Sequence, residues 1–142
     1  MSRPLKYLLD TNILLETRKK HPDPGVVRFL SDVDSANLFV SSLTLGELRK
    51  GVEMKRKSDP VMADQISEWL DGIEKTFSDK VLTVDSAVAK RWGILASDRS
   101  RPFVDTLIAA TALVHGLSLV TRNTSDLDGI SVLIVNPWDS GA

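Results

Sequence analysis

The chain has 142 residues, of which 42% are hydrophobic and none is cysteine, and its formal net charge is -1. A chain of this length buries roughly 70% of the surface that it exposes when unfolded, so we expect one domain, residues 1–142. The lack of cysteine excludes disulfides, zinc–thiolate sites and thiol nucleophiles. The small net charge predicts no overall attraction to a polyanion, so a nucleic acid would need a local basic patch.

The amino terminus leads into an apolar strand-like run without a cleavable signal segment, and no apolar run approaches the ~18 residues of a membrane span. We therefore expect a cytoplasmic protein that makes no membrane contact. With only two histidines in the chain, a metal ion would be bound mainly through oxygen. That ligand type favours a hard cation, Mg²⁺ or Mn²⁺.

Predicted strands and helices alternate along the chain. Short apolar runs bounded by turn formers predict five strands, over residues 5–9, 37–41, 81–84, 117–121 and 132–135. Helical spacing and capping residues predict helices over 11–20 and 26–31, after Ser42 or Thr44, after 58–60, after Asp85, and over 103–115. This alternation is typical of parallel βαβ units and predicts an α/β fold with a doubly wound sheet.

Four carboxylates fall where this arrangement places one edge of the sheet. Asp10 ends the first strand, Glu47 lies in the first turns of the helix after the second strand, Asp105 in the first turn of the 103–115 helix, and Asp126 in the loop after the fourth strand. Ligands of open α/β sheets bind beyond the carboxyl ends of the strands. Carboxylates gathered there repel one another, which a divalent cation offsets. The pattern therefore predicts a Mg²⁺ or Mn²⁺ site for metal-assisted phosphoryl chemistry.

Each acid also has a purely structural explanation. Asp10 and Asp105 could cap a helix or favour its dipole, and Thr44-Leu-Gly-Glu47 fits a capping box. Asp126 lies in a polar loop, where aspartate is a common turn former. Its neighbour Asp128 could be the fourth acid instead.

Several motifs occur in an order that resembles one family, and they are Leu-Leu-Asp10-Thr-Asn12, Ser-x-x-Thr44-x-x-Glu47-Leu, Asp105-x-x-Ile-Ala-Ala-Thr-Ala112, Leu-Val-Thr121-Arg-Asn123-Thr-x-Asp126 and Asn136-Pro-Trp138. Together they resemble the PIN-domain ribonucleases, and most of all the toxin subunits of VapBC-type toxin–antitoxin pairs, including the FitB-like branch. The resemblance covers nearly the whole chain. One departure is Leu127, where the family often has an aromatic residue, and we interpret it as a packing change.

The resemblance implies an α/β/α sandwich around a central, mainly parallel five-stranded sheet. It also implies a metal-dependent endoribonuclease in which Mg²⁺ or Mn²⁺ activates a water molecule. The metal-binding and catalytic residues would be Asp10, Glu47, Asp105 and Asp126. The polar residues that support them would be Thr11, Asn12, Thr121 and Asn123.

Partners follow from the same resemblance. It implies an RNA substrate, a homodimer, and a small cognate antitoxin whose carboxyl-terminal segment covers the acidic pocket with a basic side chain. Candidate RNA contacts are Arg49 and Lys50, in a basic cluster, and Arg122, which directly follows a strand. The alternative for the cluster is an ordinary solvated helix face.

Two other functions fit part of the pattern. A PIN-like module that binds nucleic acid or protein without cleaving it would keep the fold. A different Mg²⁺-dependent phosphohydrolase of the haloacid dehalogenase type would use an acid after the first strand. That family needs Asp-x-Asp, whereas this chain has Asp10-Thr-Asn12.

Overall fold

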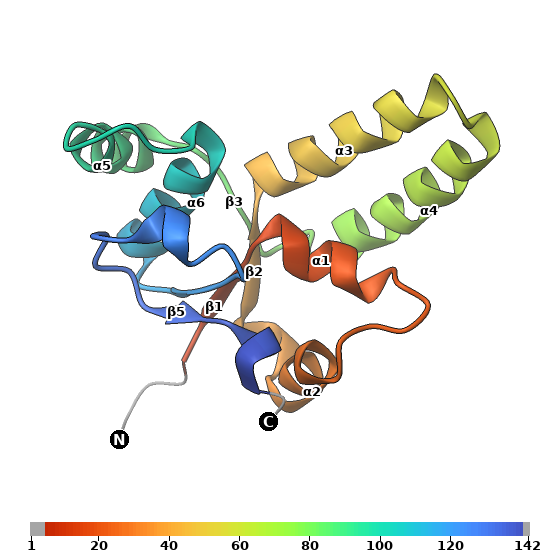
Figure 1. Ribbon diagram of the computed structural model, residues 1–142, viewed down its shortest axis with the longest axis horizontal. Coiled ribbons are helices and arrows are strands. Elements are labelled where there is room, and N and C mark those ends of the chain that lie inside the picture. The colour runs from red at the N-terminus through yellow and green to blue at the C-terminus, as the bar shows by residue number, and fades with distance from the viewer. Residues whose placement is uncertain (1–4, 141–142) are drawn as a thin grey trace.

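The structure is a computed structural model that describes residues 5–140 (Figure 1). Its strands are β1 (Tyr7–Leu9), β2 (Leu38–Ser41), β3 (Val81–Leu82), β4 (Ser118–Val120) and β5 (Ile134–Val135). Its α-helices are α1 (Thr11–Thr17), α2 (Pro24–Asp32), α3 (Ser42–Arg56), α4 (Pro60–Thr76), α5 (Ser86–Ala96) and α6 (Phe103–His115). Short 3₁₀ turns are η1 (Ser35–Asn37), η2 (Ser125–Leu127) and η3 (Pro137–Ser140).

The five strands form one parallel sheet in the order β3-β2-β1-β4-β5. The chain builds outward from β1 to β2 and β3, then returns to place β4 on the other side of β1. The change of direction therefore lies between β1 and β4, and it opens a crevice at their carboxyl ends. The predicted five-stranded sheet is confirmed, and all of its strand pairs are parallel.

Helices cover both faces of the sheet, which confirms the predicted α/β/α sandwich (Figure 1). Leu9 of β1 packs into a core with residues of α1 to α4, whereas Leu8 packs into a second core with α6. Successive side chains of a strand point to opposite faces, so one short strand anchors both layers. A small third cluster joins Val88 of α5 to α6.

Most strands and one helix are shorter than predicted. The edge strand β3 pairs only through Val81 and Leu82, and the exposed residues 83–84 lie beyond it. Likewise β4 lacks the predicted end residues 117 and 121, and β5 lacks 132 and 133. Helix α1 ends at Thr17 rather than at residue 20, because residues 18–20 are polar and exposed and do not pack into the core.

Helix α3 begins differently from the prediction. Its N-cap is Ser41, whose hydroxyl accepts a 3.0 Å hydrogen bond from the Leu43 N–H, so the expectation that Ser42 or Thr44 caps the helix is wrong. Thr44 lies inside the helix and is fully buried, with Leu48 and Val52 on the same face. This placement removes the basis for a capping box at Glu47.

Helix α6 matches its prediction and brings an acid to the crevice. Pro102 is its N-cap and Gly116, with φ of +67°, its C-cap, and its central residues are buried. Asp105 therefore lies in the first turn of the most deeply buried helix. No helix within residues 5–140 is long and apolar enough to cross a membrane.

Candidate active site

The candidate site lies where the carboxyl ends of β1 and β4 meet. Asp10 follows β1 directly and Thr121 follows β4 directly. The Asp10 N–H donates to the Val120 carbonyl at 3.0 Å, which extends the pairing of the two strands by one residue. The two polar side chains are thereby held face to face at the bottom of the crevice.

The Asp10 carboxylate is almost completely buried, with 6% of the residue exposed. Its Oδ1 accepts from the Thr11 N–H at 2.8 Å, which caps α1 as predicted. Its Oδ2 accepts from the Thr121 hydroxyl at 2.7 Å and from Asn12 Nδ2 at 3.3 Å. Burial raises the pKa of Asp10, and the bonds from Thr121 and Thr11 act in the opposite direction. Capping thus accounts for one oxygen, and the other belongs to a separate polar network.

Thr121 is the centre of that network and is itself fully buried. Besides donating to Asp10, its hydroxyl accepts from Asn12 Nδ2 at 3.3 Å and from the Asn123 N–H at 3.1 Å. Asn123 takes part through its backbone, and its side chain is exposed. Asn12 Oδ1 is buried without a hydrogen-bond partner in the described part of the chain.

Glu47 projects from the second turn of α3 and is exposed. Its Oε1 accepts a 2.7 Å hydrogen bond from the Thr11 hydroxyl, which also lies 3.3 Å from the Thr44 hydroxyl. Glu47 is therefore held by α1 across the crevice rather than by its own helix start. Our prediction treated Thr44 only as a cap, although its spacing with Leu48 places it on the buried face of α3.

Asp105 is a half-buried acid with a strongly raised pKa. Pro102 caps α6 without a side-chain bond, and within residues 5–140 the Asp105 carboxylate accepts no hydrogen bond, so helix capping does not explain it. Burial first, and then the charges of Asp10, Asp126 and Glu47, raise its pKa to about 6. The structure therefore brings all four predicted carboxylates into one electrostatic cluster.

Asp126 lies in η2 and is exposed. The loop that carries it is held by arginines that precede α6: Arg101 Nη1 donates to the Asp126 carbonyl at 3.5 Å and to the Asp128 carbonyl at 2.9 Å, and Arg99 also bonds the Asp128 carbonyl. Of the two aspartates, Asp126 is the one whose charge raises the pKa of Asp105.

The three predicted RNA-contacting residues have different surroundings. Arg49 turns toward α4, where it bonds Ser67 at 2.9 Å and pairs with Asp71 at 3.0 Å and Glu74 at 3.5 Å. The Arg122 guanidinium lies over the Trp138 ring at 4.3 Å. Lys50 is exposed and forms no ion pair with a described residue.

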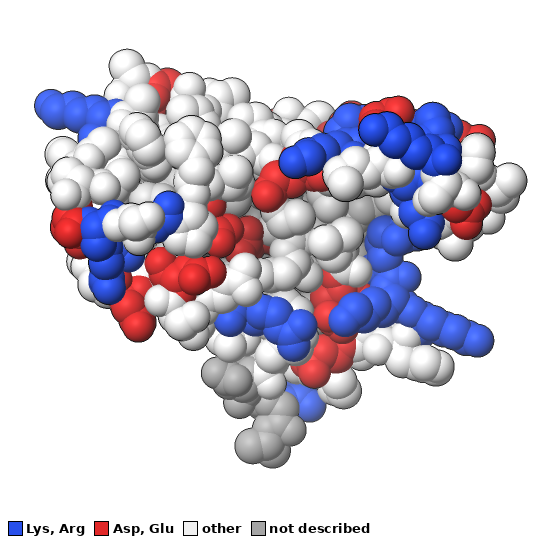
Figure 2. All heavy atoms as spheres, turned by 45° about the horizontal axis from the view of Figure 1, so that its top comes forward, with Lys and Arg blue, Asp and Glu red and all other residues white. Residues whose placement is uncertain are grey.

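Acidic side chains gather across the middle of one face, with basic side chains on either side of them (Figure 2). No ion pair in the described chain involves any of the four carboxylates. No three acidic or histidine side chains within residues 5–140 form a ready metal-binding group. The site is therefore an acidic cluster that no cation within residues 5–140 neutralises.

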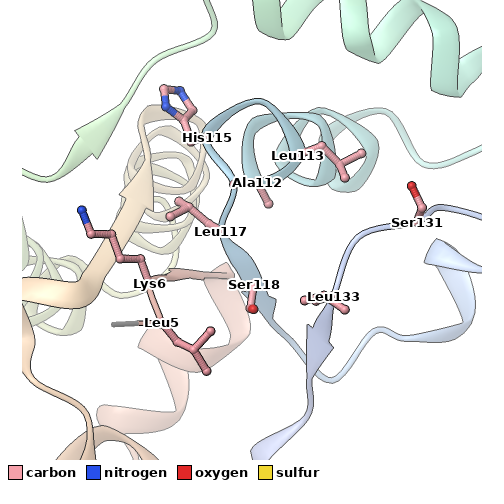
Figure 3. A pocket seen from close by; sticks show the side chains of 10 residues that line it. Leu5, Lys6, Ala112, Leu113, His115, Leu117, Ser118, Ser131 and Leu133 are labelled. Atoms are coloured by element: carbon pink, nitrogen blue, oxygen red, sulfur yellow. The ribbon is translucent and has the colours of Figure 1, made fainter. Parts of the chain in front are cut away.

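A cavity of about 760 Å³ lies away from the four carboxylates. Lys6, His115 and Leu133 line it, at the amino ends of the strands and the carboxyl end of α6 (Figure 3). None of the four carboxylates lines this cavity. Its position at the edge of the sheet opposite to Asp10 separates it from the acidic cluster.

Fold and site together define an α/β/α protein with an acidic cluster at the switch point of a parallel sheet. Comparison with known families gives the same answer, because the PIN-domain family model matches residues 7–130. The chain belongs to the PIN-domain family, which excludes the haloacid dehalogenase alternative. That residues 1–142 form a single such domain stays a prediction.

Individual relatives span nearly the whole chain. The tRNA(fMet)-specific endonuclease VapC of Shigella flexneri is 31% identical, over 94% of this chain and 98% of that protein. The crystal structure of FitAcB from Neisseria gonorrhoeae superimposes with a TM-score of 0.85 at 30% identity, over 93% of this chain and 98% of that one. A toxin–antitoxin complex from Klebsiella pneumoniae is similar, with a TM-score of 0.69 at 26% identity, over 93% and 98% of the two chains.

Proposed function

We propose that this protein is a metal-dependent endoribonuclease and the toxin component of a toxin–antitoxin system. The observation that carries the proposal is Asp105, a half-buried carboxylate that accepts no hydrogen bond from the described residues and whose pKa is raised to about 6 by burial and by three other acids. Such an arrangement costs stability unless a cation balances it. The named endonuclease activity of the VapC relative supports RNA as the substrate.

The residues that would hold Mg²⁺ or Mn²⁺ are Asp10, Glu47, Asp105 and Asp126. Oxygen ligands suit these hard cations, and the uncompensated charge fits a divalent ion. When bound, such an ion lowers the pKa of an attacking water and neutralises charge on the phosphate. Because the carboxylates do not form a ready metal-binding group, we expect an ion to draw them together.

The surrounding polar residues would keep two of these acids in place. Thr121 and Asn12 fix one oxygen of Asp10 from β4 and α1. Thr11 fixes one oxygen of Glu47. Each carboxylate is thereby held by a neighbouring element, which limits the reorganisation needed at the site. Asn123 would contribute through its backbone N–H to Thr121.

RNA phosphates would be met by Lys50 and Arg122. Lys50 lines the groove that Glu47 also lines, and Arg122 follows β4 by two residues. Arg49 contributes less in this proposal, because its guanidinium is already paired with acids of α4. Its inclusion among the RNA contacts stays a prediction.

The proposed partner is a small antitoxin that covers the acidic cluster with a basic side chain. The similar toxin–antitoxin complex from Klebsiella pneumoniae supports this part of the proposal, and an uncompensated carboxylate cluster offers a strong target for an Arg or Lys. A cytoplasmic location and a homodimer complete the proposal. Sedimentation of the purified chain would test the homodimer.

The central test is cleavage of a mixed transfer and ribosomal RNA pool by the purified protein. We expect discrete fragments with Mg²⁺ or Mn²⁺ and none with excess chelator. Asp10→Asn and Asp105→Asn should abolish them, while Asp128→Asn, an exposed loop acid outside the cluster, should not. A folded wild-type protein that cuts none of these RNAs in either metal would contradict the proposal and favour the non-catalytic binding module.

A further inference from the structure

A groove of about 510 Å³ runs along α3 and opens beside the acidic cluster. We call it the α3 groove, and the residues that define it are Leu43, Gly46, Lys50, Gly51 and Met54 of α3 and Val104 of α6. Its volume is within the range of small-molecule sites, about 300–1,000 Å³.

The α3 groove shares one lining residue, Glu47, with the candidate active site. Glu47 also contributes to the field that raises the pKa of Asp105. Val104, on the opposite wall, immediately precedes Asp105 in the sequence. A ligand in the groove would therefore lie next to the acidic cluster.

The lining combines apolar surface with one cation. Leu43, Met54 and Val104 supply apolar surface, and 60% of Met54 is exposed. Lys50 is the cation, and it has no acidic partner in the described chain, whereas Arg49 and Arg56 of the same helix are both paired with acids. An unpaired cation beside apolar surface suits a ligand with both an anionic and a flat apolar part.

The floor of the α3 groove is open because of its two glycines. A Cβ atom added at Gly46 or Gly51 would meet no atom within 4 Å. Both glycines lie inside a regular helix with ordinary backbone angles, so the helix itself does not require them. Their absent side chains leave flat backbone surface exposed to whatever occupies the groove.

We infer that the α3 groove holds a nucleobase of the RNA, with Lys50 on an adjacent phosphate. A nucleotide has the required parts, since every base has a flat apolar face and every linkage an anionic phosphate. A peptide that placed a basic side chain in the α3 groove itself, rather than on the acidic cluster, would be repelled by Lys50. This inference rests on the proposed function, since it assumes an RNA substrate, and adds a base-binding subsite to it.

The test is a substitution that fills the groove. Gly51→Leu adds a side chain to the floor, and leucine favours a helix. The matched control is Gly72→Leu in α4, where an added Cβ also meets nothing within 4 Å but the position lies outside the groove. Both are made with Asp105→Asn, so that a bound RNA is not cut, and both are compared by thermal unfolding.

Binding is measured by fluorescence anisotropy with two labelled probes of ten ribonucleotides, one with adenine bases and one abasic. We expect Gly51→Leu to weaken binding of the adenine probe about tenfold, within the range for loss of base stacking, and to leave the abasic probe unchanged. Gly72→Leu should change neither, and Lys50→Ala should weaken both. Met54→Ala, at an exposed position, should also weaken the adenine probe selectively if Gly51→Leu fails to fold.

The inference would be overturned if Gly51→Leu and Gly72→Leu bound the adenine probe with equal affinity. It would also be overturned if Gly51→Leu weakened binding of the adenine probe and of the abasic probe equally. A groove that binds an antitoxin peptide would give the first of these results. RNA cleavage by the otherwise wild-type chain separates the two proposals. If the chain cleaves RNA but Gly51→Leu leaves binding of the adenine probe unchanged, only the base subsite is refuted. If the chain does not cleave RNA, the nuclease proposal is refuted whatever the probes show.

Discussion

The Thr121 hydroxyl donates a 2.7 Å hydrogen bond to Asp10 Oδ2 from the other side of the switch point, 111 residues along the chain. Both residues are buried, so neither can exchange this bond for one to water. Thr121→Val should therefore lower the free energy of unfolding by about 1–3 kcal/mol, the usual cost of leaving a buried polar group unsatisfied.

Thr111→Val is the control for that substitution. Thr111 is also fully buried, but its hydroxyl donates only to the Leu107 carbonyl of its own helix. Urea unfolding at pH 7 should show a much smaller loss for Thr111→Val. Equal losses would mean that the bond to Asp10 adds nothing to stability.

The raised pKa of Asp105 predicts how the metal-free protein responds to pH. The pKa is about 6 in the folded protein against 3.8 ordinarily, so the unfolded chain releases this proton first as the pH rises. Asp105 therefore lowers stability progressively between about pH 4 and 6, and its full penalty is present above that range. Asp105→Asn should stabilise the protein at pH 7.5 by about 1–2 kcal/mol, allowing for solvent screening.

Unfolding curves at pH 4 and 7.5 check this prediction. The advantage of Asp105→Asn should shrink strongly at pH 4, close to the ordinary pKa of 3.8, where the folded wild-type carboxyl is protonated and the unfolded one is partly protonated. A destabilised Asp105→Asn protein at pH 7.5 would show that this side chain supports the start of α6 instead.

Asp126 and Asp128 should differ in their influence on Asp105. Of these two aspartates, only Asp126 contributes to the raised pKa of Asp105, so Asp126→Asn should lower that pKa and Asp128→Asn should leave it unchanged. Carbon-13 NMR titration of the Asp105 carboxyl measures both variants directly. If Asp128→Asn lowered the pKa of Asp105 and Asp126→Asn did not, Asp128 would be the fourth acid of the cluster.

Divalent cations should stabilise the wild-type protein by binding its folded state. Millimolar Mg²⁺ or Mn²⁺ should raise the thermal midpoint, while Asp105→Asn should show a smaller rise because it lacks one proposed ligand. Lys50→Ala, which keeps all four acids, serves as the control and should respond as the wild type does. An identical response from Asp105→Asn would remove this residue from the metal site.

Arg49 and Lys50 are neighbours on α3 with different expected roles. Arg49→Ala breaks two partly exposed ion pairs to α4, so it should cost about 0.5–1 kcal/mol of stability with little effect on RNA binding. Lys50→Ala should leave stability unchanged and reduce the salt dependence of RNA binding by about 0.7 in slope, as for one contact to a single strand. If Arg49→Ala and Lys50→Ala weakened RNA binding equally, Arg49 would also be an RNA contact.

The sequence pattern located the acids well because parallel topology constrains them. A residue directly after a buried strand, such as Asp10, or in the first turn of a buried helix, such as Asp105, must lie near one edge of the sheet. The capping box, which was the structural alternative for Glu47, is not formed, and the reason is local. Ser41, Ser42 and Thr44 are all suitable caps, and only the strand boundary decides among them.

Contacts between distant segments could not be predicted in the same way. Arg49 belongs to a run of basic residues that resembles a solvated face, and its pairing with Asp71 depends on how α3 and α4 align. The resemblance pointed to Thr121 as a support, but its bond to Asp10 depends on the pairing of β1 with β4. Side-chain partners of this kind follow from packing, which periodicity does not encode.

The pairing of β1 with β4 also has a consequence for synthesis. Asp10 leaves the ribosome before its partner strand β4 and before Asp126, which lie more than a hundred residues further along the chain. Until residues 118–126 emerge, the growing chain lacks both the strand that forms the switch point and one of the four acids. The acidic cluster therefore cannot assemble before residue 126 has emerged, and a partner that recognises the complete cluster can bind only after that point.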